Sequence, residues 1–100
     1  MPSFPSLAHL RSQLRSLLPR LRQEYAVETL EIFGSYVRAE ATPESDLDLL
    51  VTFSRPPSLF EYIALENYLS DALGVPVDLV MKDALKPRIG KRILQEAQPV

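Results

Sequence analysis

The spacing of hydrophobic residues alternates along the chain between helical and strand patterns, and this alternation restricts the possible folds more than any other feature. Leucines between residues 7 and 21 recur mostly at intervals of three and four, which predicts one apolar stripe on a helix that begins at Ser6. Pro19 lies inside this helix, so we expect a kink there or a second short helix after it. The helical period returns over residues 59–73, where Gly74 follows as a C-terminal cap.

Three segments between and after these helices have strand character. Residues 26–34 alternate in part, residues 46–53 are rich in branched apolar side chains, and residues 75–81 form the third predicted strand. Pro87 then begins a short amphipathic helix. We expect its apolar residues to face inward and its charged residues to face outward. The inward residues are Ile89, Ile93 and Leu94, and the outward ones are Arg88, Lys91, Arg92 and Glu96. This order predicts an α/β (α+β) fold, a small mixed β-sheet of about three strands flanked by helices.

Length and composition indicate an ordinary globular protein. One hundred residues suffice for one domain, residues 1–100, with a single core. The chain is 46% hydrophobic and 24% charged, and its net charge of −2 gives no general attraction to nucleic acid or to an anionic membrane. It has no cysteine, no long apolar run and no signal-peptide pattern, so we expect a cytoplasmic protein that binds neither membrane nor nucleic acid directly.

The segment DLDLLV, residues 46–51, places two aspartates at the start of an otherwise apolar strand. Side chains alternate along a strand, so Asp46 and Asp48 are expected on one face while Leu47 and Leu49 pack on the other. Asp78 is alone among apolar neighbours in the third strand. If the second and third strands are neighbours, the three carboxylates converge, and their repulsion raises at least one pKa unless cations compensate.

Converging carboxylates would suit divalent cations. Hard oxygen ligands with positions left open for phosphates favour Mg²⁺ or Mn²⁺, and two such ions can clamp the attacking and leaving oxygens of a phosphoryl displacement. Taken alone, the aspartate pair is equally compatible with a charged strand end.

Gly34 and Ser35 follow the first strand and supply the other half of a candidate site. Glycine allows a sharp turn, and if Ser35 opens a short helix through Arg38, its amides form an anion site with the hydroxyl as an additional donor. The outer phosphates of a nucleotide could then bind there. Arg38 either adds positive charge to this site or pairs with the carboxylates, and the spacing does not distinguish these roles. Gly-Ser alone is a weak signal, since most such pairs are plain turns.

These residues together resemble a known family. The stretch GSYVRAEATPESDLDLLV, in which Ser35 precedes Asp46 by eleven residues, is similar to the G-S-x-x-R-G and S-D-x-D-L signature of minimal nucleotidyltransferases of the DNA polymerase β-like superfamily. VPVDLVMKDALKPRIGKRIL is similar to the third-carboxylate strand and closing helix of that family, so the resemblance covers nearly the whole chain. One position departs from the signature, because the usual glycine after the motif arginine is Ala39, which affects the path of the loop that follows.

The resemblance implies a polymerase β-like nucleotidyltransferase fold and the transfer of AMP from ATP with two divalent ions. By position, it assigns Gly34 and Ser35 to the triphosphate, Asp46 and Asp48 to both metals, and Asp78 to the catalytic metal and to deprotonation of the acceptor hydroxyl. Arg38 is expected to serve the nucleotide. Small members of this family are commonly antitoxins that form a complex with a HEPN-domain ribonuclease toxin and adenylylate a tyrosine near its active site.

Alternatives remain open at this level. One is an antitoxin that binds nucleotide but neutralises its toxin by contact alone. Another, transfer to a small molecule such as an aminoglycoside, is disfavoured because the enzymes of that kind carry an added domain for the acceptor. Other polar residues have plainer interpretations: Asp71 and Asp83 lie beside helix ends, His9 is expected to be solvated, and Lys86, Arg88, Lys91 and Arg92 are more often a solvated helix face than a binding patch.

Overall fold

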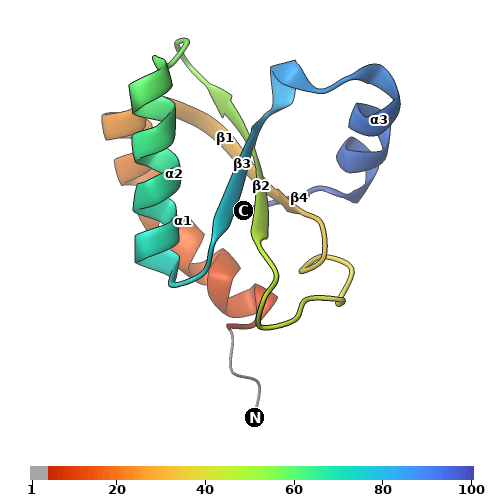
Figure 1. The fold of residues 1–100 in the computed structure, drawn as a ribbon. Coiled ribbons are helices and arrows are strands. Elements are labelled where there is room, and N and C mark those ends of the chain that lie inside the picture. Colours follow the sequence, from red (N-terminus) through yellow and green to blue (C-terminus); the bar gives the residue numbers. More distant parts are fainter. Residues whose placement is uncertain (1–4) are drawn as a thin grey trace.

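A four-stranded mixed sheet lies between two long helices on one side and a shorter helix on the other (Figure 1). The computed structural model describes residues 5–100. The strands are β1 (Val27–Phe33), β2 (Leu47–Phe53), β3 (Val77–Met81) and β4 (Gln98–Pro99), in the order β3-β2-β1-β4. β1 is antiparallel to β2 and β4, whereas β2 and β3 are parallel. The parallel pair requires a crossover, which the second long helix provides.

The sheet has four strands rather than the expected three or so. The additional strand, β4, pairs with β1 at Glu31 and Ile32. It has only two residues and one of them is Pro99, so no alternation exists from which it could be predicted. Long-range contacts hold it instead: the Val100 amide donates to the Leu30 carbonyl at 3.1 Å.

Within residues 5–100, three α-helices and a 3₁₀ turn complete the fold: α1 (Leu7–Tyr25), α2 (Leu59–Leu73), η1 (Lys82–Ala84) and α3 (Pro87–Glu96). Ser6, where the first helix was predicted to begin, caps α1 by accepting from the His9 amide at 3.2 Å. Ser58 and Glu61 form a capping box at the start of α2, and Gly74 ends that helix at φ 71°. α1 continues through Pro19 to Tyr25, so the alternative of a second short helix is wrong.

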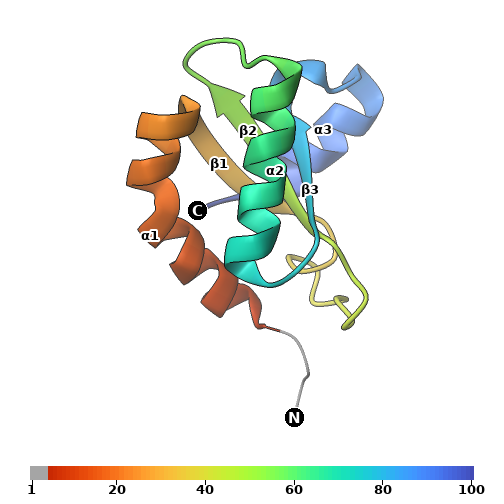
Figure 2. The same ribbon diagram turned by 60° about the vertical axis from the view of Figure 1, so that its left-hand side comes forward.

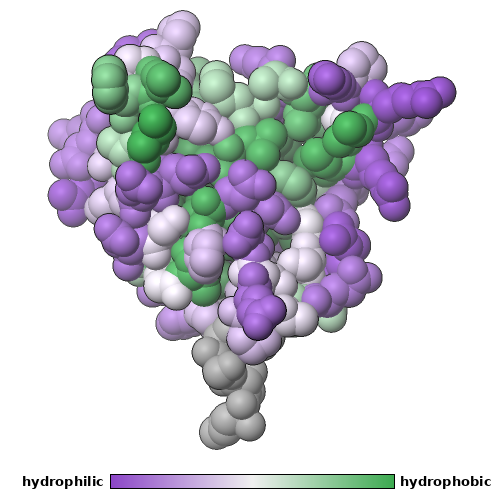
Figure 3. All heavy atoms as spheres, viewed as in Figure 1, coloured by the Kyte–Doolittle hydropathy of each residue, from purple (hydrophilic) through white to green (hydrophobic). Residues whose placement is uncertain are grey.

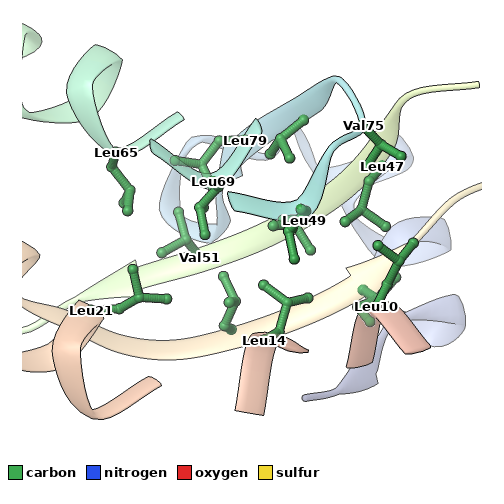
Figure 4. Close-up of a cluster of buried hydrophobic side chains, with 14 of the residues drawn as sticks. Leu10, Leu14, Leu21, Leu47, Leu49, Val51, Leu65, Leu69, Val75 and Leu79 are labelled. Carbon is green, nitrogen blue, oxygen red and sulfur yellow. The ribbon is translucent and has the colours of Figure 1, made fainter. Parts of the chain in front are cut away.

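The main core lies between the sheet and the pair α1 and α2, which cover the same face (Figure 2). Leucines from α1, such as Leu10 and Leu14, meet Leu47 and Leu49 of β2 and residues of α2 such as Leu69 (Figure 4). Every one of these five side chains is fully buried. The predicted leucine stripe and strand alternation therefore pack against each other, and the even-numbered side chains of β2 are left on the opposite face.

The opposite face of the sheet is covered only in part, by α3. Two of its side chains, Phe33 and Leu50, are buried. The prediction that Ile89 and Leu94 face inward is wrong, because they are 62% and 45% exposed. α3 instead makes its close approach through Gly90, where an added Cβ would lie 2.9 Å from the Leu85 Cβ.

No helix within residues 5–100 combines the length and the apolar character needed to cross a membrane.

Candidate functional site

Asp48 and Asp78 are directly opposite each other on the adjacent parallel strands β2 and β3. Their neighbours Leu47, Leu49 and Leu79 belong to the core on the α1 and α2 side, so the two carboxylates project from the other face. The predicted convergence of these two residues is therefore confirmed. Asp46 comes just before β2 and is exposed, so it lies at the edge of the pair rather than within the strand.

The charge of this group is not compensated. The pKa of Asp48 rises from 3.8 to about 6, first because the carboxyl is partly buried and then because the negative charges of Asp78 and Asp46 repel its ionised form. Arg38 acts in the opposite direction but does not cancel these effects. The expected rise of a carboxylate pKa thus falls on Asp48, and a bound cation would relieve it.

Gly34 ends β1 immediately beside Asp48. Its φ of 83° lies in the left-handed region, and a Cβ at this position would be 2.0 Å from the Asp48 Oδ2 atom. Glycine is therefore required twice, for the backbone conformation and for the close approach of the carboxylate. The Gly34 turn and the Asp48 carboxylate are therefore packed directly against each other.

Residues 35–39 form hydrogen-bonded turns rather than the short helix expected to open at Ser35. The amides of Val37 and Arg38 both donate to the Gly34 carbonyl, at 3.0 and 3.2 Å, and the Glu40 amide donates to the Ser35 carbonyl at 2.9 Å. These bonds fold the segment tightly after β1 and bring Arg38 back toward the sheet.

Ala39 occupies the position of the family glycine and keeps the glycine-like backbone, with φ 59°. The loop therefore holds a left-handed conformation at a residue whose Cβ disfavours it.

Glu96, at the end of α3, is a site residue that the sequence analysis missed. One carboxylate oxygen accepts from the Gly34 amide at 2.8 Å and the other from the Arg38 guanidinium at 2.7 Å. Burial alone would raise the pKa of Glu96, but these two hydrogen bonds, together with the positive charges of Arg38 and Arg92, outweigh it and lower that pKa. Arg38 also pairs with Glu40 at 3.2 Å, so its direct partners are glutamates, and its charge acts on Asp48 without an ion pair between them.

A cleft of about 800 Å³ opens where the Gly34 turn, Asp48 and α3 face one another. Its volume is in the range of small-molecule sites. Its lining residues are Phe33, Gly34, Arg38, Glu40, Asp48, Arg88, Ile89, Arg92, Ile93 and Glu96. Three of the sequence-predicted site residues, Gly34, Arg38 and Asp48, thus share one cavity wall, whereas Ser35, Asp46 and Asp78 lie outside this lining.

The donor set suits a divalent cation whose coordination is completed by a substrate. Across the part of the chain that the structure describes, no three acidic or histidine side chains are grouped closely enough to hold an ion unaided. The oxygens available at Asp46, Asp48 and Asp78 are nevertheless hard carboxylate donors, and Mg²⁺ is usually held by one or two carboxylates together with phosphates and water. The residues therefore fit Mg²⁺ that arrives with a nucleotide.

A nucleotidyltransferase domain model matches residues 14–100, most of the chain. Among curated proteins, the protein adenylyltransferase MntA of Thermococcus cleftensis is 46% identical over 91 residues, which is 91% of this chain and 92% of that protein. A solved structure named provisionally as a minimal nucleotidyltransferase is 37% identical, has a TM-score of 0.82, and is matched over 98% of this chain and 99% of its own.

A more distant structural match shares the fold alone. It is the complex of a tri-AMPylated Shewanella oneidensis HEPN toxin with an MNT antitoxin, at 19% identity and a TM-score of 0.66, over 90% of this chain and 70% of the matched one. The family model and the relatives at 37% and 46% identity carry the assignment. The chain belongs to the nucleotidyltransferase domain family.

Proposed function

We propose that this nucleotidyltransferase transfers AMP from ATP to a tyrosine of a partner HEPN-domain ribonuclease, and that it thereby acts as the antitoxin of a toxin–antitoxin pair in the cytoplasm. The observation that carries the proposal is the opposition of Asp48 and Asp78 on adjacent strands, with Asp48 against the Gly34 turn at the cleft. The name of the relative at 46% identity supports a protein acceptor. The fold shared with an antitoxin bound to an AMPylated HEPN toxin supports the class of partner.

In this proposal, Gly34, Ser35 and Arg38 hold the triphosphate. The backbone of the turn is fixed by its hydrogen bonds, and the Ser35 hydroxyl is an additional donor beside it. Arg38 is oriented in advance by Glu96 and Glu40, so little side-chain freedom is lost when it meets a phosphate.

Asp46, Asp48 and Asp78 would hold Mg²⁺. When bound there, Mg²⁺ supplies positive charge against the phosphates and against the oxygens that attack and leave. The raised pKa of Asp48 supports this role, because the repulsion that raises it is the repulsion that a cation would remove.

The chemical step is a displacement at the α-phosphorus of ATP. The tyrosine oxygen forms a new bond to that phosphorus, the bond to the bridging oxygen of the β-phosphate breaks, and pyrophosphate leaves. The hydroxyl proton passes to Asp78, which is exposed on the open side of the site where a protein side chain can reach it. The product is a tyrosine bearing one AMP.

The test is the intact mass of the neighbouring gene's product, expected to be the HEPN-domain partner, after incubation with this chain, ATP and Mg²⁺. We expect one or more additions of the mass of AMP with the wild type and none with the Asp46→Asn/Asp48→Asn variant. Circular dichroism would show that the variant is folded. Fragmentation of the modified protein would identify the acceptor and must place AMP on tyrosine.

A second arm separates catalysis from simple binding. If the double variant still protects cells that express the toxin, and the wild type adds no mass while the two proteins co-purify, then the chain is a contact antitoxin and the proposed transfer is wrong.

A further inference from the structure

The α3 wall of the cleft carries two arginines on one helical face. Arg88 and Arg92 are separated by one turn, and both line the cleft together with Gly34 and Asp48. Hydrophilic side chains project from the region of α3 at the right of Figure 3, with hydrophobic surface between them and the sheet. The sequence pattern favours a solvated helix face for these arginines, but their position in the cleft points to a ligand.

Arg88 is not explained by the stability of α3, whereas the charge of Arg92 attracts the Glu96 carboxylate one turn along the helix and helps to lower its pKa. Like charges four residues apart on a helix repel each other, and Arg88 is the residue after Pro87 in the first turn, where the helix dipole disfavours a positive charge. The first turn of α3 contains no acidic residue. Within residues 5–100, the five ion pairs include neither Arg88 nor Arg92. Both side chains are exposed and available to a ligand.

The opposite wall of the cleft differs in this respect. Arg38 is already paired with Glu96 at 2.7 Å and with Glu40 at 3.2 Å, so much of its charge is neutralised before any ligand binds. A ligand with several negative charges therefore finds on α3 two cations that take part in none of the ion pairs within residues 5–100. Arginine suits this purpose because its guanidinium is always charged and its planar array of donors matches phosphate oxygens.

We propose that Arg88 and Arg92 bind the triphosphate of the nucleotide from α3, across the cleft from the Gly34 turn. This inference rests on the proposed function, which makes the ligand a nucleoside triphosphate. It adds a second cationic wall to the phosphate site, supplied by α3, which lies outside the G-S-x-x-R-G and S-D-x-D-L motifs.

The experiment compares the binding of AMP-PNP and AMP by calorimetry, at one Mg²⁺ concentration and one ionic strength. The variants are Arg88→Ala, Arg92→Ala and the double variant. Lys91→Ala is the matched control, because Lys91 is exposed on the same helix but lines a separate groove with Lys86 and Leu94. Arg88→Lys/Arg92→Lys keeps the charge and removes the paired donors.

Each alanine variant is expected to weaken AMP-PNP binding by roughly tenfold or more, the usual effect of losing a charge-assisted hydrogen bond. AMP has a single phosphate, so its binding should change far less. The double lysine variant should fall between the wild type and the double alanine variant, and Lys91→Ala should bind both ligands as the wild type does. Thermal unfolding would confirm that α3 remains folded, which we expect because removing like charges relieves repulsion.

Unchanged AMP-PNP affinity in the double alanine variant would overturn the inference, and so would equal weakening for AMP and AMP-PNP. Normal AMP-PNP binding with loss of the HEPN partner would assign the arginines to a protein interface and would also overturn it. The experiment distinguishes a failure of this inference from a failure of the proposed function. Arginine-dependent AMP-PNP binding without AMP transfer would refute only the transfer, whereas AMP transfer with arginine-independent binding would refute only the inference.

Discussion

Glu96 joins the end of α3 to the phosphate turn by accepting a hydrogen bond from the Gly34 amide at 2.8 Å. The same carboxylate also accepts from Arg38, so one side chain satisfies a backbone donor and orients a guanidinium. Glu96 is thus a positioning residue that couples the two walls of the cleft.

Replacing Glu96 should therefore reduce stability. Glu96→Ala leaves the Gly34 amide and Arg38 without this acceptor, and we expect a loss of about 1–3 kcal/mol in the free energy of unfolding, measured by urea denaturation. Glu96→Gln retains a neutral acceptor and should lose less. The control is Glu40→Ala, which removes an exposed partner of the same arginine and should change stability by less than about 0.5 kcal/mol. Equal losses at both glutamates would contradict the bridging role.

The ionised carboxylate of Asp48 should lower the free energy of unfolding of the metal-free protein at neutral pH. Its pKa rises from 3.8 to about 6 on folding, so its stabilising contribution is fully present below pH 3.8 and is lost as the pH rises through about 6. Asp48→Asn removes the charge, and it should raise the free energy of unfolding at pH 7 by about 1–2 kcal/mol, since solvent screens part of the repulsion. The measurement is urea denaturation between pH 4 and 7 with EDTA.

The advantage of Asp48→Asn should disappear near pH 4, because the wild-type carboxyl is then protonated. Asp71→Asn, on an exposed face of α2, provides a control that should stay within about 0.5 kcal/mol of the wild type throughout. Parallel curves for wild type and Asp48→Asn would refute the prediction.

Gly34→Ala should be far more damaging than Gly74→Ala. Both glycines have positive φ, but an added Cβ meets the Asp48 carboxylate at Gly34 and meets nothing within 4 Å at Gly74. Gly74→Ala should therefore lose only the backbone penalty of about 1–2 kcal/mol, and Gly34→Ala should lose this and a steric term in addition. Thermal or urea unfolding of the two variants measures the difference.

A double variant identifies the cause of the steric term. Combining Gly34→Ala with Asp48→Ala removes the side chain that the Cβ would strike, so the two effects should be strongly non-additive. Additive losses would show that the Asp48 contact is not the source.

Ala39→Gly should stabilise the protein. Ala39 has φ 59°, a conformation that glycine adopts without the Cβ penalty, and we expect a gain of about 0.5–1 kcal/mol after the greater freedom of glycine in the unfolded chain is included. Ala64→Gly, at an exposed position inside α2, should have the opposite effect and destabilise by about 1 kcal/mol. Destabilisation by Ala39→Gly would mean that the loop does not need the left-handed conformation.

The parts of the site that lie on regular strands were predictable from the sequence. Alternation placed Asp48 on the face opposite the leucines, and its opposition to Asp78 required only that β2 and β3 be neighbours. The glycine turn was predictable because Gly34 interrupts a strand pattern. Similarly, the repulsion that raises the pKa of Asp48 follows from the placement of like charges, before any coordinate is known.

The contribution of α3 was not predictable in the same way. Helical periodicity treats Glu96 as an outward residue and Ile89 as an inward one, whereas α3 packs through Gly90 against Leu85, which turns a charged side of the helix toward the cleft. A helix face is defined by what it contacts, and that contact depends on the path of the chain through η1. β4 was missed for a related reason, since two residues carry no period.

The parallel pairing of β2 and β3 also determines the stage of folding at which the site forms. Asp48 and Asp78 meet only after α2 has crossed over the sheet and β3 has joined its edge, a contact between distant parts of the chain that forms late relative to local structure. A chain cleaved within α2 would still contain every residue of the site but would carry the two aspartates on separate fragments. If the partner toxin is made at the same time, the folding time of this crossover is the shortest possible delay between synthesis and protection.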